Sequence, residues 1–286
     1  MDNLRGSLLM VLAMAGFALE DAFVKTLARD LHVGHILMLI GAGGTVIFTI
    51  AALSQRDRLI SRDILNRPLL LRNLGELTAA VCFVTALALA DLSLVSAILQ
   101  ATPLAVTFAA ALFLGETVGW RRWSAIVVGL IGVLIVLRPG ADSFSPLSIL
   151  AVLGMLGFAG RDLASRAAPA SLGTHVLGFY GFLAVVLAGA LYALWEQEAF
   201  VQPSGTGALY MTGAICVGVF AYGALMRAMR TGEVSAVTPF RYSRLLLGVG
   251  LGVLWFGESI DVQMVLGCGL IVLSGLYILW RGARAG

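Results

Sequence analysis

Charged side chains occur inside long apolar stretches of this sequence, where their types and spacing could bind a small charged molecule. A charge at the centre of a bilayer costs about 2.5–3.5 kcal/mol on insertion scales, so it normally faces a wet cavity or an opposite charge. The charged residues inside apolar stretches are Glu20, Asp21, Lys25, Arg72, Glu76, Arg161, Asp162, Arg166, Arg227, Arg230, Arg241 and Arg244. We expect the substrate site to lie among them.

Two arginines of the ninth apolar stretch are candidates for binding an anionic group. Arg241 and Arg244 lie about two to three turns from its start, too deep for an easy reach to the membrane surface. Pro239 interrupts the helical hydrogen bonding just before them, and transporters bind carboxylates at broken helices. Tyr242 adds an aromatic ring with a hydroxyl group.

Arg72 and Glu76 lie one turn apart, on one face of a helix. They could form a local ion pair that holds the helix end. Alternatively, Glu76 could stand at a cavity mouth and meet an ammonium group or a proton. Glu76 or Asp162 could also pair with the arginines of the ninth stretch, which would then hold helices together.

Two pairs of adjacent charged residues, Glu20-Asp21 and Arg161-Asp162, occupy matching places in two similar segments described below. We assign Arg161 and Asp162 to the lining of the substrate cavity, and Glu20 and Asp21 to gating or proton coupling. A structural role for the two aspartates is the alternative. Gln100 is an uncharged polar residue at a similar depth, suited to substrate contact or to a hydrogen bond between helices.

Other charged residues have a structural explanation. Long basic side chains near helix ends extend to the interface, and this is expected for Lys25, Arg166, Arg227 and Arg230. Glu116 and Glu258 each follow a glycine at the end of a stretch, where glycine suits the turn and an acid suits the next helix start. Gly248 and Gly252 predict a close-packing helix face.

The composition requires a membrane around these residues. Of 286 residues, 59% are hydrophobic and 12% are charged, with a mean hydropathy of +0.95. A soluble domain carries about 25% charged residues, so a soluble enzyme, a nucleic-acid binder and a disordered chain are excluded. A span needs about 20 apolar residues. Ten such runs occur, at about 5–27, 34–54, 70–90, 93–114, 121–138, 146–166, 173–195, 206–228, 233–256 and 261–281.

Lys and Arg residues gather at one set of span ends, which predicts that both termini are cytoplasmic. The tryptophans lie at span ends, as in an aromatic belt: Trp120, Trp123, Trp195, Trp255 and Trp280. The first run resembles a signal peptide, but Glu20, Asp21 and Lys25 follow it without a small-residue cleavage site, so we expect it to be retained.

The sequence offers little for catalysis or metal binding. Cys82, Cys216 and Cys268 lie in apolar runs without paired spacing, which predicts neither a disulfide nor a metal site. Neither G-x-S-x-G nor H-E-x-x-H occurs in the sequence. We therefore expect no cofactor, no metal and no enzymatic activity.

The chain contains an internal repeat. Met14–Lys25 reads MAGFALEDAFVK and Met155–Arg166 reads MLGFAGRDLASR; Val95-Ser96-Ala97 recurs as Val234-Ser235-Ala236. The spacing between these matching segments predicts two repeats of five helices, residues 1–139 and 140–286. Because five is odd, the second repeat enters the membrane from the opposite side, an arrangement that recurs in secondary transporters. The expected fold is an all-α polytopic membrane protein, with ten helices as two inverted repeats around a central cavity.

With its ten spans, the Leu114-Gly115-Glu116 and Phe256-Gly257-Glu258 endings and the stretch from Pro103 to Gly132, the chain resembles the EamA-type drug/metabolite transporter superfamily. Within it the chain is most similar to bacterial amino-acid exporters, including exporters of aromatic amino acids. The resemblance implies a monomeric transporter of the bacterial cytoplasmic (inner) membrane that moves amino acids or related metabolites by alternating access, with or without protons. The alternatives are a transporter of a cofactor-like metabolite or drug, and an intramembrane enzyme.

Overall fold

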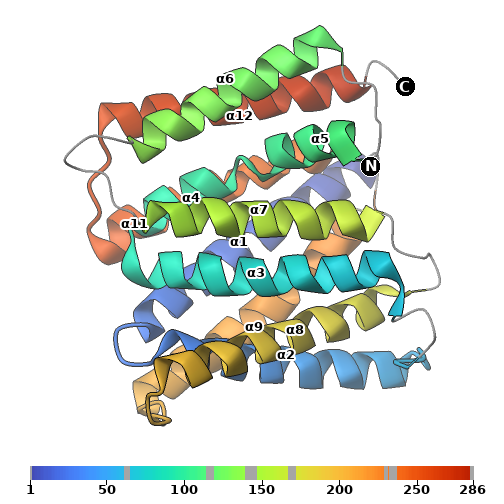
Figure 1. Cartoon of the computed structure of the whole chain (residues 1–286), viewed down its shortest axis with the longest axis vertical. Helices are drawn as coiled ribbons and strands as arrows, with labels where there is room; N and C mark the ends of the chain where they lie inside the picture. The colour runs from blue at the N-terminus through green and yellow to red at the C-terminus, as the bar shows by residue number, and fades with distance from the viewer. Residues whose placement is uncertain are drawn as a thin grey trace.

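The computed structural model contains only helices and their connections in its described residues, which are 2–60, 65–113, 119–138, 147–166, 172–228, 231 and 237–283. Its helices are α1 (Asp2–Leu27), α2 (Val33–Ser54), α3 (Arg67–Leu89), α4 (Leu92–Leu99), α5 (Thr102–Phe113), α6 (Trp120–Leu137), α7 (Ser148–Arg166), α8 (Thr174–Glu196), α9 (Gly205–Ala228), the 3₁₀ helix η2 (Thr238–Tyr242), α11 (Ser243–Phe256) and α12 (Val262–Ala283). Figure 1 shows them running across the view, with the start of α1 on the right. We call that side the N-terminal face and the opposite side the far face.

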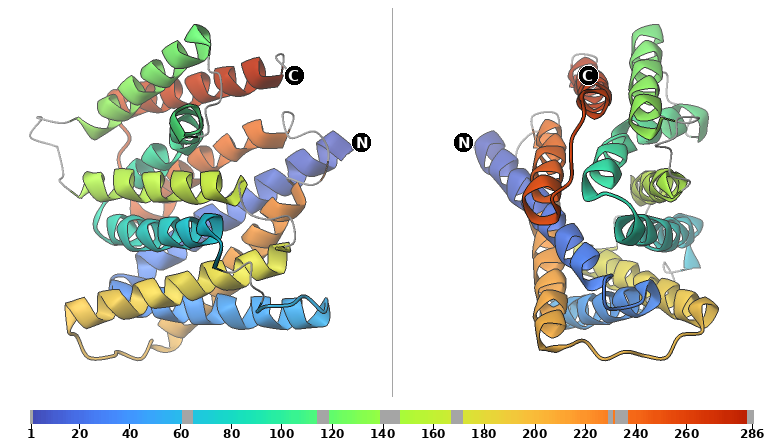
Figure 2. Two further views of the ribbon diagram at one scale, coloured as in Figure 1. Left: turned by 45° about the vertical axis from the view of Figure 1, so that its right-hand side comes forward. Right: turned by 90° about the vertical axis from the view of Figure 1, so that its left-hand side faces the viewer.

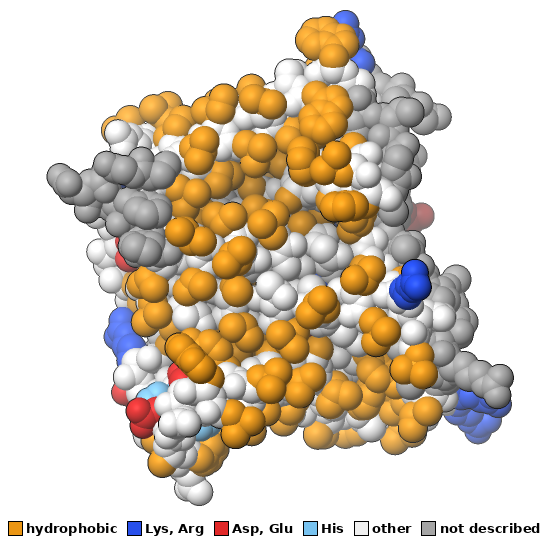
Figure 3. Space-filling model, viewed as in Figure 1, with side chains coloured by type: hydrophobic (Ala, Val, Ile, Leu, Met, Phe, Trp, Pro, Cys, Tyr) orange, Lys and Arg blue, Asp and Glu red, His pale blue; other side chains and the backbone are white. Residues whose placement is uncertain are grey.

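The helices reproduce the predicted membrane spans. In the described part of the chain, nine segments are long and apolar enough to cross a membrane, with α4 and α5 together forming one of them. The remaining predicted span, 233–256, contains η2 and α11. Figure 3 shows large apolar side chains over much of the side of the bundle that it displays. Leu130, Leu187 and Leu254 are among the exposed apolar residues of the chain, which suits contact with lipid. The chain is a polytopic membrane protein.

The fourth and ninth spans are both interrupted. Pro239 lies in η2, so the predicted break of the ninth span is confirmed. The fourth span, predicted at about 93–114, is present over Leu92–Phe113 and contains an interruption that was not predicted. α4 ends at Leu99, and Pro103 occupies the first turn of α5. Proline has no N–H to continue the ladder, and the Gln100 and Ala101 N–H groups bond three residues back, which tightens the turn.

The helix pairs reveal the inverted repeat. Extensive pairings join α1 with α9, α3 with α7, α2 with α8, α6 with α12 and α4 with α11. When the five spans of each half are numbered from 1 to 5, span 1 of each half pairs with span 3 of the other half. Spans 2, 4 and 5 of one half each pair with the span of the same number in the other half. The pattern is unchanged when the halves are exchanged, as a pseudo-two-fold axis in the membrane requires. Figure 2 shows α6 beside α12 at one end of the bundle and α2 beside α8 at the other.

Glycines let paired helices approach closely. A Cβ atom at Gly248 would lie 2.3 Å from Ser96 Oγ, and one at Gly252 would lie 2.3 Å from Ser93 Oγ. The predicted packing face of α11 is thus confirmed, with α4 as its partner. Between α3 and α7, a Cβ at Gly157 would lie 2.6 Å from the backbone nitrogen of Ala79. This close approach brings the polar residues of α3 and α7 together.

Candidate functional site

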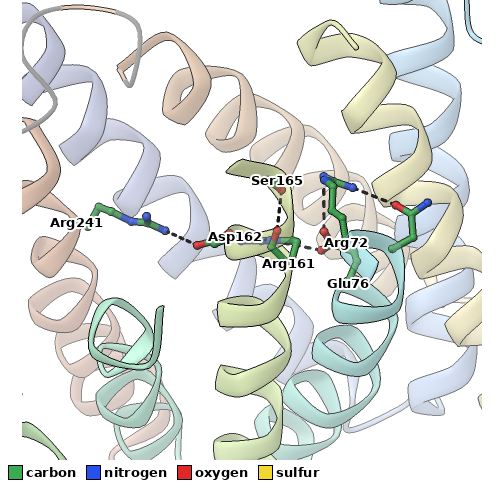
Figure 4. A network of polar contacts seen from close by, with 7 residues as sticks. Arg72, Glu76, Arg161, Asp162, Ser165 and Arg241 are labelled. Atoms are coloured by element: carbon green, nitrogen blue, oxygen red, sulfur yellow. Dashed lines mark hydrogen bonds and ion pairs between the residues drawn. The ribbon is translucent and has the colours of Figure 1, made fainter. Parts of the chain in front are cut away.

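Five charged residues form a chain of ion pairs inside the bundle. Along this chain, Arg72 and Glu76 of α3 are followed by Arg161 and Asp162 of α7 and then by Arg241 of η2. Figure 4 shows the side chains reaching toward one another from these three elements. Arg72 lies near the start of α3 and Arg161 near the end of α7. The ion-pair chain is therefore in the half of the bundle nearer the N-terminal face.

Arg161 is the centre of this ion-pair chain. Its Nη1 donates to Glu76 Oε1 at 3.3 Å, while Nε and Nη2 donate to Asp162 Oδ1 at 3.0 and 2.9 Å. The guanidinium also lies over the ring of Phe158, 4.7 Å from its centroid. One arginine therefore holds two carboxylates. Through Glu76, it also connects the second half of the polypeptide to the first.

Asp162 and Arg241 form the looser end of the chain. Arg241 Nη2 lies 3.6 Å from Asp162 Oδ2, beyond an ordinary hydrogen bond. The exposed fractions of the two side chains are 29% for Arg241 and 24% for Asp162. A guanidinium and a carboxylate are thus held close together without a tight bond, and both side chains are partly exposed.

Arg72 is the other end of the ion-pair chain, and this end is buried. It is only 3% exposed, and a Cβ atom at Gly181 of α8 would lie 3.2 Å from its Nη2. Its Nη2 lies 3.8 Å from Glu76 Oε2, and its Nη1 donates to Asn73 Oδ1 at 3.2 Å. The ion pair expected from the i, i+4 spacing is present, but the contact of Glu76 with Arg161 was not predicted.

Asp21 and Arg244 form a second, tighter pair. Arg244 Nη2 donates to Asp21 Oδ2 at 2.7 Å, and the guanidinium lies over the rings of Phe17 and Phe83. The partners expected for the two arginines of the ninth span were Glu76 and Asp162, so the contact with Asp21 was not predicted. The signal was the duplication itself. Asp21 and Asp162 occupy matching positions, and each pairs with one arginine of the ninth span.

Glu20 adds a carboxylate beside this second pair. A Cβ atom at Gly218 of α9 would lie 2.4 Å from its Oε1, so the side chain lies directly against that helix. The Glu20 carboxyl group interacts electrostatically with Asp21, Arg244 and Glu76. None of the other described residues forms a hydrogen bond or ion pair with Glu20.

Tyr242 and Gln100 are buried at the two span interruptions. Tyr242 is 6% exposed and its hydroxyl packs against Gly275 of α12, with no hydrogen-bond partner among the described residues. Gln100 is 5% exposed and caps the end of α4. Their roles in substrate binding stay predictions.

Lys25 and Glu258 have more specific roles than expected. Gly257 adopts the left-handed conformation that ends α11, as predicted. Glu258, however, accepts hydrogen bonds from the backbone N–H groups of Leu92 at 2.7 Å and Ser93 at 2.8 Å, so it caps α4 rather than the following helix. The Lys25 side chain lies against the end of α3. It is 15% exposed and donates to the carbonyl oxygens of Leu87 and Ala90 at the end of α3.

Other structural expectations concern the surface and the loops. Arg227 is exposed in the last turn of α9, as expected for an interfacial arginine. Glu116 and Arg230 lie outside the described residues, as does the side chain of Arg166. The described part of the chain holds no cluster of three His, Cys, Asp or Glu residues that could bind a metal.

The sequence is similar to those of several named transporters. The riboflavin transporter of Vibrio cholerae is 32% identical over 183 residues, which cover 64% of this chain and 60% of that protein. The pseudopaline exporter CntI of Pseudomonas aeruginosa is 30% identical over 278 residues, 94% of each chain. The S-adenosylmethionine uptake transporter of Rickettsia bellii is 25% identical over 201 residues, 70% of this chain and 67% of that one.

A solved crystal structure supports the same fold. It matches 99% of this chain and 98% of its own with a TM-score of 0.62 and 18% sequence identity. The model of the EamA-like transporter family matches residues 4–138 and, a second time, residues 146–280. With two matches that cover nearly the whole chain, this protein belongs to the EamA-like transporter family and is a membrane transporter.

Proposed function

We propose that this transporter exports amino acids, including aromatic ones, or closely related zwitterionic metabolites. The observation that carries the proposal is the open pair of Arg241 and Asp162, 3.6 Å apart and both partly exposed. The carboxylate of a zwitterion replaces Asp162 on the Arg241 guanidinium, and its ammonium group replaces Arg241 on Asp162. Both exchanges conserve charge-assisted contacts, so neither protein charge is left without a partner.

The charge balance of the interior supports a zwitterion over an ion. Among the described residues, four carboxyl groups and four guanidiniums lie around the site: Glu20, Asp21, Glu76 and Asp162, and Arg72, Arg161, Arg241 and Arg244. A zwitterion leaves this balance unchanged. A cationic drug would add an uncompensated charge in a poorly hydrated region, which is unfavourable.

The remaining candidates have supporting roles in this proposal. Arg244, Tyr242 and Gln100 border the two span interruptions and contact the rest of the substrate. Arg72, Glu76 and Arg161 position Asp162 through the ion-pair chain. Glu20 and Asp21 serve gating or proton coupling, since Glu20 is an acid without an ion-pair partner in the described part of the chain and Asp21 is bound to an arginine of the ninth span.

Location and direction are part of the same proposal. The protein works as a monomer in the bacterial cytoplasmic membrane, with both termini in the cytoplasm and repeats at 1–139 and 140–286. The biased distribution of Lys and Arg supports this orientation. The ion-pair chain lies nearer the N-terminal face, so in this orientation the substrate is collected from the cytoplasm, as export requires.

A second candidate substrate is a cofactor-like metabolite. The named riboflavin and S-adenosylmethionine transporters among the relatives favour it. Riboflavin differs chemically from the first proposal because it lacks an amino-acid group to exchange with the Arg241–Asp162 pair, whereas S-adenosylmethionine carries one.

Counterflow in proteoliposomes separates these candidates. Vesicles preloaded with an unlabelled compound are given the same compound in radiolabelled form, with and without a pH gradient. The compounds are aromatic and aliphatic amino acids, riboflavin and S-adenosylmethionine. We expect trapping of label with amino acids and none with riboflavin. Exchange of riboflavin alone would select the second candidate, and an accumulation that follows the pH gradient would establish coupling to protons.

A further inference from the structure

Lys25 and Glu258 converge on the turn between α3 and α4 at the far face. Lys25 Nζ donates to Leu87 O at 3.4 Å and to Ala90 O, and it lies 4.0 Å from Glu258 Oε1. Glu258 accepts from Leu92 and Ser93. A cation thus caps the carboxyl end of α3 and an anion caps the amino end of α4, each with the favourable sign for the helix dipole. We call Lys25 and Glu258 the far-face latch.

The latch lies where the two halves of the chain are closed against each other. Glu258 belongs to the second half, and the N–H groups that it binds belong to the first. Next to it α4 packs along α11, at Ser93 against Gly252 and Ser96 against Gly248. Beyond their interruptions the two spans diverge, because α5 packs on α6 and α7 while η2 packs on α1 and α12. The fourth and ninth spans therefore meet toward the far face and part toward the N-terminal face.

Transport requires this joint to open. The candidate site lies nearer the N-terminal face, and a substrate that crosses to the far face must pass the region closed by α4 and α11. Inverted repeats exchange their open faces by rocking one bundle against the other. When α4 leaves α11, the Leu92 and Ser93 N–H groups must leave Glu258.

We propose that Lys25 and Glu258 latch the far face closed and release in every transport cycle. The side chains are 15% and 6% exposed, so both charges lose much of their hydration in the closed state. On opening, water replaces the contacts at both groups, which lets the latch break without leaving a dry charge. The proposal rests on the transport function of the family and is independent of the substrate.

Cysteine accessibility tests the latch without a substrate. In a variant whose Cys82, Cys216 and Cys268 are replaced by alanine, Ser96→Cys provides a reporter behind the latch, since Ser96 is 1% exposed. A membrane-impermeant maleimide is applied from the far face. Lys25→Met and Glu258→Gln should each raise the labelling rate about tenfold or more, because each removes charge-assisted hydrogen bonds that hold the joint.

Matched variants separate a latch from a permanent cap. Asp261→Asn removes an ion pair to Arg138 at the same face, between α6 and α12, and should leave the labelling rate unchanged. Lys25→Arg, which keeps the charge, should label more slowly than Lys25→Met. If Glu258→Gln fails to fold, Lys25→Met still carries the test, since it leaves the bonds of Glu258 to α4 in place. Folded Lys25→Met protein that labels at the rate of the unaltered latch would overturn the proposal.

Discussion

Asp162 on α7 and Arg241 on η2 lie 3.6 Å apart inside the bundle, with about a quarter of each side chain exposed. Asp162 is also held by Arg161, so its position is fixed from one side and open on the other. A pair that is oriented but not tightly bonded is suited to exchange with a zwitterion. The tighter pair of Asp21 and Arg244, at 2.7 Å, joins the matching aspartate of the first repeat to the ninth span.

Neutralising either member of the open pair should strongly reduce transport of zwitterions. Arg241→Gln removes the partner of the substrate carboxylate, and Asp162→Asn removes the partner of its ammonium group. Each loses a charge-assisted bond of about 1.5–3 kcal/mol, so we expect at least about a tenfold fall in amino-acid counterflow. Arg227→Gln is the control, because Arg227 is exposed at the end of α9. Equal losses in all three variants would mean that the effect is not specific to the pair.

Two glycines of α7 should differ sharply in their tolerance of alanine. A Cβ at Gly157 would lie 2.6 Å from the Ala79 backbone nitrogen, whereas one at Gly160 would meet nothing within 4 Å. Overpacking costs about 1–3 kcal/mol, so Gly157→Ala should lower thermal stability in detergent. Gly160→Ala should leave it unchanged or raise it, since alanine favours a helix by about 0.5–1 kcal/mol. A reversed order would contradict the close packing of α3 and α7.

Glu20 should control the response to a pH gradient rather than binding itself. Glu20→Gln removes the ionisable group but keeps its size, and Asp21 remains bound to Arg244. We expect amino-acid exchange to continue while any accumulation driven by a pH gradient is lost. The exposed Glu198, replaced by Gln, is the matched control. Gradient-driven accumulation that persists in Glu20→Gln would assign coupling to another group.

The ion pair between Asp261 and Arg138 at the far face should be sensitive to acid. Hydrogen bonds from Arg138 and from the Met264 N–H hold the pKa of its carboxyl below the ordinary value of 3.8. A lowered pKa in the folded state stabilises the fold above pH 3.8, and this contribution is lost as the pH falls through the lowered value. Thermal melts of the unaltered protein and Asp261→Asn should therefore differ at neutral pH and converge in acid. A difference that does not change with pH would exclude the ion pair as its cause.

The sequence predicts the spans because lipid imposes a long apolar run on every helix. It predicts the inverted repeat because Asp21 and Asp162 recur in similar segments, which the pairing of α1 with α9 and α3 with α7 reflects in space. It does not predict the partners of individual charges. The contacts of Glu76 with Arg161 and of Glu258 with α4 join residues far apart in the chain, and they depend on helix rotations that small residues such as Gly157 determine.

Competition by substrate derivatives tests most directly whether the Arg241–Asp162 pair recognises a zwitterion. Counterflow of a radiolabelled amino acid is measured in the presence of the free amino acid, its amide or its N-acetyl derivative. The amide lacks the carboxylate for Arg241, and the N-acetyl derivative lacks the ammonium group for Asp162. We predict strong competition by the free amino acid and weak competition by both derivatives. Equal competition by all three compounds, or no exchange of any amino acid, would contradict the account.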